Sequence, residues 1–505
     1  MPYDRTLKSL TAAATVAAAM ALQAAHVHAA SVVMLDPFPP TRGWAMETDD
    51  SFTLMRAGCL EGLARIDFDQ KMQPSLATSW EQSSPTSWDF SIRQGVKFHD
   101  GQDLNAAAVV NSLTHVLTAE VPARAINPKV VSGVEAIDDY TVRISTPSPS
   151  VLLPYRLASA NAGILSPAAY SDTGAINPVG TCTGPFVVTE ILPKQLLRMV
   201  ANENYWGGDV GIAEAEVHYV QDGNTRVTQL RSGEAQIGTK IPLGARASLE
   251  NDPAFVVHAL EIPRTTAMYL NNKQEPFSNP LIRKAVQAAV DIRAIVASAY
   301  EGIGTPAIGP FAPSEPWAPA IEAAAYDPER AKALLEEAGI GPGELSLELR
   351  AYNSRPELPD VAQIIQQQLK EVGINVAVII TDWAGLEPSF MGGTYDMAMM
   401  SRGHQLDVAD PLGFLQADYT CDGSFNVSHV CNGDIDALLQ NAAGVADNDE
   451  RFAIYEKVAR WLQEDAINIF IVHQQETNAV QANVKNFRTH PLNHYYLTKE
   501  IVIEE

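Results

Sequence analysis

The stretch from Pro74 to Leu117 reads PSLATSWEQSSPTSWDFSIRQGVKFHDGQDLNAAAVVNSLTHVL. Apolar and polar residues alternate from Trp88 to Arg93, which is the period of a β-strand. The triplet His99-Asp100-Gly101 predicts a turn, and Asn105 can cap a helix whose apolar residues recur at helical spacing. The stretch therefore predicts a strand, a turn and a capped helix in succession.

Outward from this stretch, local patterns predict further strands and helices. Expected strands or hairpins cover Val32 to Leu35, Val134 to Ser145, Leu345 to Tyr352, Asn375 to Ile380 and Thr394 to Met400. Expected helices cover Phe52 to Leu63, Pro280 to Tyr300, Pro359 to Val372 and Ile435 to Gln440. The alternation in the middle of the chain is typical of α/β lobes with largely parallel strands. Because 505 residues exceed what one ordinary core serves, we expect two or three lobes.

The composition is strongly acidic. The chain has 35 basic and 60 acidic residues, which gives a formal net charge of −25. Such a charge argues against nucleic acid and anionic membrane surfaces as partners. Solubility explains the excess of acids at least as well as a cationic ligand does.

The first thirty residues have the three parts of a secretory signal peptide. Arg5 and Lys8 form a basic start, Leu10 to Ala25 is rich in alanine, leucine and valine, and Val27-His28-Ala29 supplies small residues for a cleavage site. The apolar run is shorter than the ~20 residues that span a bilayer. We therefore expect that residues 1–29 are removed by cleavage near Ala29, which leaves a soluble, exported protein in the periplasm.

The four cysteines suggest disulfides because the chain carries an export signal. Cys421 and Cys431 enclose a short loop, and we expect them to pair with each other. For Cys59 and Cys182 the sequence leaves two alternatives open. They form a second disulfide, or they remain two buried free thiols.

Several motifs follow the Pro74 to Leu117 stretch in a fixed order. They are PVGTCTGPF at 178–186, NENYWG at 202–207, YLNN at 269–272, PLIRKAV at 280–286, Tyr326-Asp327-Pro328 with the helical run 331–339, and the segment 432–439. As an ordered set, these motifs resemble the family-5 extracellular solute-binding proteins, which are the receptors of bacterial peptide, nickel and opine ABC importers.

This resemblance implies an α/β fold of the periplasmic-binding-protein type, class II, as in dipeptide and oligopeptide receptors, with three hinged lobes that enclose the ligand. Lobe I would combine residues 31–61, 184–271 and 475–505; lobe II would be 62–183 and lobe III 272–474. The resemblance also implies an ABC permease and ATPase as partners, and transport rather than catalysis. The sequence lacks the G-x-S-x-G and G-x-x-x-x-G-K-[ST] signatures of enzymes, and we expect a monomer without a cofactor.

The segment from Ser401 to Leu439 is the candidate site, because it is loop-rich and follows a predicted strand, where open α/β sheets bind ligands. In peptide-binding relatives, an aspartate four residues before a proline pairs with the α-ammonium group of the ligand. Asp407 has this position before Pro411, and a carboxylate gives an ammonium a charge-assisted hydrogen bond. Asp410 is better placed to cap the following turn.

A carboxylate on the ligand requires a basic partner, which we expect among Arg264, Arg355 and Arg402, because arginine holds a carboxylate with two bonds. His404 stands where peptide-binding relatives usually carry a tryptophan. Nickel-complex relatives use arginines in lobe II, whereas Leu157 to Pro167 contains none. The remaining candidates flank the same strand and loop: Thr265, Thr266, Phe414 and Tyr419.

For metals, His404 and His429 could meet across the loop and complete the coordination of a chelated ion. Structural or solvent-facing roles are the alternative for both histidines. The sequence as a whole predicts a periplasmic receptor for a short peptide or a peptide-like, amine-bearing solute such as an opine. The alternative ligand is a metal–chelator complex that contains nickel or an opine metallophore.

Overall fold

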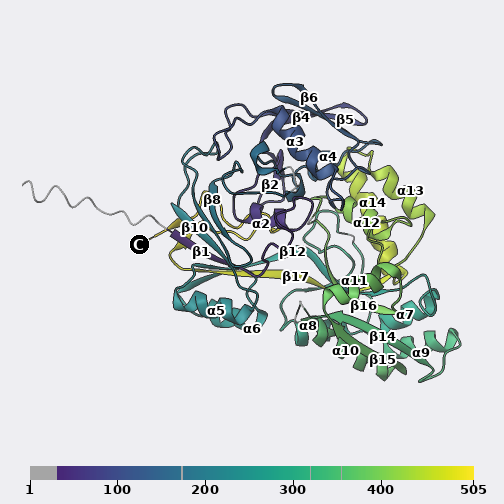
Figure 1. The fold of residues 1–505 in the computed structure, drawn as a ribbon. Helices are drawn as coiled ribbons and strands as arrows, with labels where there is room; N and C mark the ends of the chain where they lie inside the picture. The colour runs from purple at the N-terminus through teal and green to yellow at the C-terminus, as the bar shows by residue number, and fades with distance from the viewer. Residues whose placement is uncertain are drawn as a thin grey trace, which may run out of the picture.

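The computed structural model describes residues 31–504, with the exception of residues 172–174, 319, 354, 356 and 406. The predicted signal peptide, residues 1–29, lies outside these described residues. The described chain is a mixed α/β protein built mainly on one large sheet and one smaller sheet (Figure 1).

The large sheet joins segments from all parts of the chain. Within the described residues it has eleven strands in the order β15-β14-β16-β12-β17-β11-β1-β10-β9-β8, and β13 pairs with β17. In this order the strands are β15 (Ile374–Thr381), β14 (Leu345–Tyr352), β16 (Met397–Gly403), β12 (Phe255–Leu270), β17 (Asn468–Gln481), β11 (Ile237–Gly238), β1 (Ser31–Asp36), β10 (Glu214–Tyr219), β9 (Leu196–Ala201), β8 (Phe186–Leu192) and β13 (Thr305–Pro306). β14 is parallel to β15 and β16, and β1 is parallel to β10 and β11. The expectation of parallel strands therefore holds for β14, β15 and β16 in residues 345–403. Apart from the two β1 pairs, the remaining strand pairs of this sheet are antiparallel.

Two long antiparallel strands run through the centre of this sheet. β12 and β17 pair from Phe255 opposite Gln481 to Tyr269 opposite Asn468, and their register shifts between Glu261 and Thr265. Figure 1 shows both strands passing from the part that holds β1, β8 and β10 to the part that holds β14, β15 and β16. The two parts therefore share one continuous ribbon.

The smaller sheet confirms the reading of the Pro74 to Leu117 stretch. It has the order β4 (Ala77–Ser84), β5 (Ser87–Ile92), β7 (Thr141–Ser145) and β6 (Gly133–Asp138), and α3 (Ala106–Leu117) packs beside it. The side chain of Asn105 accepts a hydrogen bond from the amide of Ala108 at 3.0 Å, which is the predicted helix cap. The predicted hairpin at 134–145 is β6 and β7.

The helices agree with the sequence patterns except at some ends. The helix expected from Phe52 to Leu63 is α2 (Asp50–Arg56), which ends early because Gly58 has a φ of 71° that turns the chain away. The run expected from Pro280 to Tyr300 is two helices, because Asp291 begins the second by capping it. The helices of the second half are α7 (Pro280–Ala289), α8 (Ile292–Ala299), α9 (Pro328–Glu337), α10 (Glu357–Glu371), α11 (Trp383–Gly392), α12 (Pro411–Tyr419), α13 (Gly433–Ala442) and α14 (Asn448–Glu464).

Shorter elements complete the described chain. The helices are α4 (Leu153–Arg156), α5 (Gly223–Ser232) and α6 (Leu243–Glu250), and the strands are β2 (Ala64–Ile66), β3 (Met72–Pro74), β18 (Val484–Lys485) and β19 (Val502–Ile503). α5 and α6 lie together beside the large sheet (Figure 1). Within the part of the chain that the structure describes, every helix is too short or too polar to cross a lipid bilayer.

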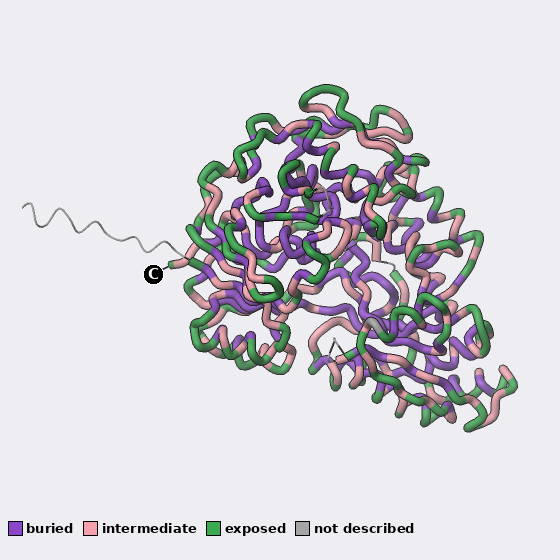
Figure 2. Tube along the Cα trace, viewed as in Figure 1, coloured by how far each residue is buried: buried purple, intermediate pink, exposed green. Residues whose placement is uncertain are grey.

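Two large hydrophobic cores hold these elements. One contains residues of 267–472 together with Leu152, and the other contains residues of 32–217 together with Ile237 and residues of 480–501. Figure 2 shows buried residues along the central strands and exposed residues on the outer turns and helix faces. The lobe boundaries expected from the resemblance remain a prediction; the second core contains residues of both predicted lobes I and II.

Both disulfides are present. Cys421 pairs with Cys431, which confirms the prediction from the short loop. Cys59 pairs with Cys182, which decides between the two alternatives in favour of a second disulfide. This second bond joins residues that are 123 positions apart in the chain.

Candidate ligand-binding site

Asp407 follows the end of β16 and lies against arginines from two different segments. Its Oδ1 accepts a hydrogen bond from Arg124 Nε at 2.8 Å, and its Oδ2 lies 4.0 Å from Arg402 Nη1. Only 14 % of the Asp407 side chain is exposed. Arg124 also forms an ion pair with Asp49 at 2.5 Å. The predicted ligand aspartate is therefore part of a charged cluster.

Arg402 is held by a buried acid. Its Nε and Nη2 donate to the two carboxylate oxygens of Asp418 at 2.9 and 2.8 Å. Its guanidinium also lies over the rings of Phe425 and Phe414, 4.8 and 5.7 Å from their centroids. Burial works to lower the pKa of Arg402, but Asp418 raises it further, so the net pKa is above the usual value and the arginine stays charged.

Arg264 and Arg355 lie near Arg402, and carboxylates neutralise their positive charges less completely than Asp418 neutralises that of Arg402. Arg264 Nη1 donates to the carbonyl of Ser401 at 2.9 Å, and among the described residues no carboxylate forms an ion pair with it. Arg355 Nη1 lies 3.9 Å from a carboxylate oxygen of Glu357. Burial and the positive charges of Arg355 and Arg402 lower the pKa of Arg264. An anionic group bound beside these guanidinium groups would relieve that repulsion.

A small cavity adjoins Arg264, with a volume of about 20 Å³. Its lining comes from β12, the end of β16 and the C-terminal segment: Ile262, Pro263, Arg264, Gly403, Pro491, Leu492 and Asn493. The cavity is large enough for one water molecule. The middle of β12, the end of β16 and the C-terminal segment thus meet at Arg264.

The predicted threonines lie in the interior and already have protein partners. Thr265 Oγ1 donates to the carbonyl of Pro310 at 2.8 Å and lies 2.9 Å from His473 Nδ1. Thr266 Oγ1 accepts from the side chains of Gln474 and Tyr300 at 3.0 and 3.2 Å. Since both hydroxyl groups are occupied and buried, they support β12 and do not offer a free group to a ligand.

His404, Phe414 and Tyr419 lie behind the arginines and not on an open surface. His404 Nε2 is 2.7 Å from a carboxylate oxygen of Glu315, and both side chains are buried. The rings of His404 and Tyr419 pack on Phe414 at 5.8 and 5.4 Å. All three residues are therefore packing neighbours of the charged cluster, and the ligand contact predicted for them stays a prediction.

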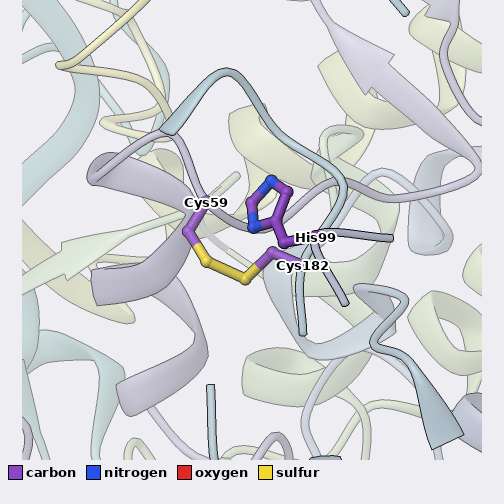
Figure 3. A group of neighbouring side chains, drawn as sticks. All are labelled: Cys59, His99 and Cys182. Atoms are coloured by element: carbon purple, nitrogen blue, oxygen red, sulfur yellow. A yellow bond between two sulfur atoms is a disulfide. The ribbon is translucent and has the colours of Figure 1, made fainter. Parts of the chain in front are cut away.

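The structure does not bring together the two histidines of the metal alternative. His404 contacts Glu315, whereas His429 Nε2 lies 2.8 Å from the carbonyl of Phe390. Among the described residues, one group of three metal-type side chains exists: Cys59, His99 and Cys182. Figure 3 shows the two sulfur atoms of this group bonded to each other beside the His99 ring. A disulfide is not a thiolate ligand, so this group is structural.

Sequence reasoning missed Arg124, Asp49 and Arg156. Arg156 stands immediately before the arginine-free stretch 157–167, is buried, and donates to the carbonyl of Ala125 at 2.9 Å. Burial lowers its pKa to about 10. Arg124 is 283 residues away from Asp407 in the chain and lies in no motif, so no local signal could have joined the two.

The family model described as bacterial extracellular solute-binding proteins, family 5, matches residues 71–426. The chain belongs to family 5 of the bacterial extracellular solute-binding proteins. Its fold is therefore the mixed α/β fold of periplasmic binding proteins, and its role is to bind a small solute for an ABC importer. Family 5 proteins are solute binders and not enzymes.

The chain is similar to proteins that are named for, or were solved with, different solutes. The di/tripeptide-binding protein 2 of Pseudomonas aeruginosa is 29 % identical over 455 residues, which cover 83 % of this chain and 84 % of that protein. The solved structure of AgaA from A. tumefaciens with agropinic acid is 26 % identical, covers 94 % of this chain and 99 % of its own, and has a TM-score of 0.80. NikA from Staphylococcus aureus, with nickel and L-histidine, is 24 % identical, covers 94 % and 100 %, and has a TM-score of 0.81, which shows the fold alone.

Proposed function

We propose that this family 5 protein binds a short peptide or a peptide-like, amine-bearing solute such as an opine. The observation that carries the proposal is the position of the Asp407 carboxylate 4.0 Å from Arg402, whose positive charge, together with that of Arg355, acts on Arg264. A carboxylate can hold the ammonium group of the solute, and an arginine with incomplete neutralisation can hold its carboxylate. A zwitterionic solute matches both charges.

The mechanism that we propose is closure of lobes around the solute. In the structure, segments of the predicted lobes II and III already touch, and Leu152 of lobe II packs in the core of residues 267–472. Arg124 pairs with Asp407, and the amide of Val151 donates to the carbonyl of Ala443 at 3.0 Å. A solute that contacts both sides of the cleft stabilises the closed arrangement because its affinity for that arrangement is higher.

Two relatives support this class of solute. The similar protein of Pseudomonas aeruginosa is named for di- and tripeptides, and the similar protein AgaA holds agropinic acid. Backbone groups at strand ends would contribute much of the affinity, which makes binding tolerant of side-chain identity. That tolerance suits a nutrient receptor that delivers its solute to an ABC permease and ATPase.

The second candidate, a metal–chelator complex, draws on the same arginines, which could hold chelator carboxylates. His404 and His429 do not support it, since they contact different partners. Elemental analysis of the purified protein separates the two candidates. A stoichiometric transition metal in the native protein would favour the chelate.

Native mass spectrometry of protein purified from periplasm tests the proposal. We expect an organic adduct of low mass that fragments as amino acids or as an amine-bearing acid. Protein that has been denatured, dialysed and refolded serves as the control and should lose the adduct. Titration calorimetry of the refolded protein with dipeptides, tripeptides and opines, each with its N-acetylated form, then identifies the class. Equal binding of the acetylated forms would contradict an ammonium anchor.

A further inference from the structure

Arg124 occupies the side of Asp407 that an ammonium group would use. Its Nε lies 2.8 Å from Asp407 Oδ1, which is the distance of a charge-assisted hydrogen bond. The other oxygen, Oδ2, lies 4.0 Å from Arg402 Nη1. Because 86 % of the Asp407 side chain is already covered (14 % is exposed), little of the carboxylate remains for a further cation.

Arg124 has a second carboxylate partner, which it can keep when it leaves Asp407. Its Nη2 lies 2.5 Å from Asp49 Oδ1, and the Asp49 side chain is 75 % exposed. If an ammonium displaced Arg124 from Asp407, the guanidinium would keep one carboxylate partner and a solvated position, since 46 % of its side chain is exposed. The displacement therefore costs one ion pair and leaves no buried charge alone.

We propose that Arg124 is a specificity-determining residue that competes with the ammonium group of the solute for Asp407. This inference rests on the proposed function. A solute anchored by an amine alone gains little, because it only exchanges one cation on Asp407 for another. A solute that also places a carboxylate beside Arg264 and Arg355 gains a second anchor that Arg124 does not contest. The competition thus lowers the affinity for every amine-bearing solute, so that tight binding requires the second anchor that only a zwitterion has.

The arrangement of three segments adds a directional prediction. The three residues come from three predicted lobes: Asp49 from lobe I, Arg124 from lobe II and Asp407 from lobe III. Asp49 and Asp407 attract the same guanidinium, so the attraction of Asp49 makes Arg124 easier to displace from Asp407. Removal of Arg124 should strengthen amine binding. Removal of the Asp49 charge should weaken it, since Arg124 is then left with Asp407 as its carboxylate partner. Substitutions of Arg124 and of Asp49 are therefore expected to change the affinity for amines in opposite directions.

Calorimetric titration of the wild type, Arg124→Gln and Asp49→Asn tests the inference. Each protein is titrated with the amine-bearing solute that binds the wild type most tightly among the dipeptides, tripeptides and opines, and with the carboxamide of that solute, which lacks the carboxylate. For Arg124→Gln we expect an affinity about fivefold higher both for the solute and for the carboxamide, because both displace the same guanidinium. For Asp49→Asn we expect a lower affinity for both. Arg231→Gln is the matched control, because Arg231 on α5 has a similar exposure of 40 % and pairs with Asp252, which follows α6, away from the cluster.

The outcomes distinguish this inference from the proposed function. If the wild type binds the solute and Arg124→Gln binds it equally or more weakly, the competition is overturned while the receptor function stands. If both variants change affinity in the same direction, the competition is overturned as well. If neither the wild type nor Arg124→Gln binds any amine-bearing solute of the panel, the proposed function fails, and the inference fails with it.

Discussion

Arg402 and Asp418 form a two-point ion pair, with guanidinium nitrogens 2.9 and 2.8 Å from the two carboxylate oxygens. The Asp418 side chain is 1 % exposed and that of Arg402 is 17 % exposed. The pair fixes the position of the Arg402 guanidinium near the end of β16. It therefore links the stability of this loop to the charge of the candidate site.

Asp418→Asn should lower the free energy of unfolding by about 3 kcal/mol, because it leaves a buried guanidinium without its counter-charge. Urea unfolding followed by circular dichroism measures the loss. Asp89→Asn is the matched control, since Asp89 has the same two-point geometry with Arg143 at 2.7 and 2.7 Å on the surface. Equal losses for the two variants would show that burial does not distinguish the pairs.

Asp407 and Asp410 should behave in opposite ways. Asp410 is buried, caps α12 through the amide of Leu412 at 2.9 Å, and accepts from Arg451 and Tyr455 at 3.2 and 2.6 Å. Asp410→Asn should therefore lower the melting temperature markedly. Asp407→Ala should weaken an amine-bearing solute more than about tenfold with little change in melting temperature, as expected for a single ammonium anchor.

Thermal scans and calorimetry on the same two proteins measure both effects. Solute affinity that is unaltered in Asp407→Ala removes Asp407 from the site. A melting temperature that falls as far in Asp407→Ala as in Asp410→Asn would assign Asp407 a mainly structural role.

The two disulfides should contribute unequally to stability. In the chain-entropy model, a loop of 123 residues between Cys59 and Cys182 gives ~5 kcal/mol, and a loop of 10 residues between Cys421 and Cys431 gives ~3 kcal/mol. Urea unfolding of the two double serine variants compares the contributions, and non-reducing peptide mapping of the wild type checks the pairing. A larger loss for the pair Cys421 and Cys431 would contradict the chain-entropy explanation.

Acid should destabilise the protein through two buried histidines. Burial lowers the pKa of His473 and of His490 to about 3. In the unfolded chain a histidine binds a proton near pH 6.5, so between pH 6.5 and 3 the unfolded state holds more protons than the folded state. The free energy of unfolding is therefore retained above pH 6.5 and falls as the pH decreases, by up to about 1.4 kcal/mol per pH unit and histidine.

His490→Asn isolates one of these contributions. The asparagine oxygen can replace His490 Nδ1, which accepts from the amides of Leu492 and His494 at 3.1 and 3.3 Å. We expect a shallower pH dependence of the unfolding free energy below pH 6.5 in this variant than in the wild type. An unchanged slope in His490→Asn would contradict the assignment.

Most of the local elements could be predicted from the sequence because short-range patterns determine them. The strand at 345–352 and the Asn105 cap follow from alternation and from capping chemistry. α12 lies inside the segment from Ser401 to Leu439, which the sequence pattern predicts to be loop-rich. Asp410 followed by Pro411 is nevertheless a helix-start signal. The signal was present, but the glycines and acids around it concealed the nine-residue helix.

The candidate site was predictable in part. Asp407, Arg264, Arg355 and Arg402 could be chosen by residue type and by position relative to strand ends. In the structure Arg402 lies close to Asp407, and the charges of Arg402 and Arg355 lower the pKa of Arg264. Their environments could not be predicted, because burial and charge neutralisation depend on distant segments. Arg124 is the clearest case, since its contact with Asp407 exists only after the parts of the chain have come together.

The ribbon of β12 and β17 constrains how the two halves of the molecule can move. Residues of each strand pack in the core of 267–472 at one end, and at the other end both strands pack with α5 and α6. Sliding of one half past the other would break a ladder of hydrogen bonds, whereas flexing where the register shifts, between Glu261 and Thr265, leaves the ladder on both sides intact. We therefore expect the two halves to move relative to each other by bending of this ribbon and not by sliding along it.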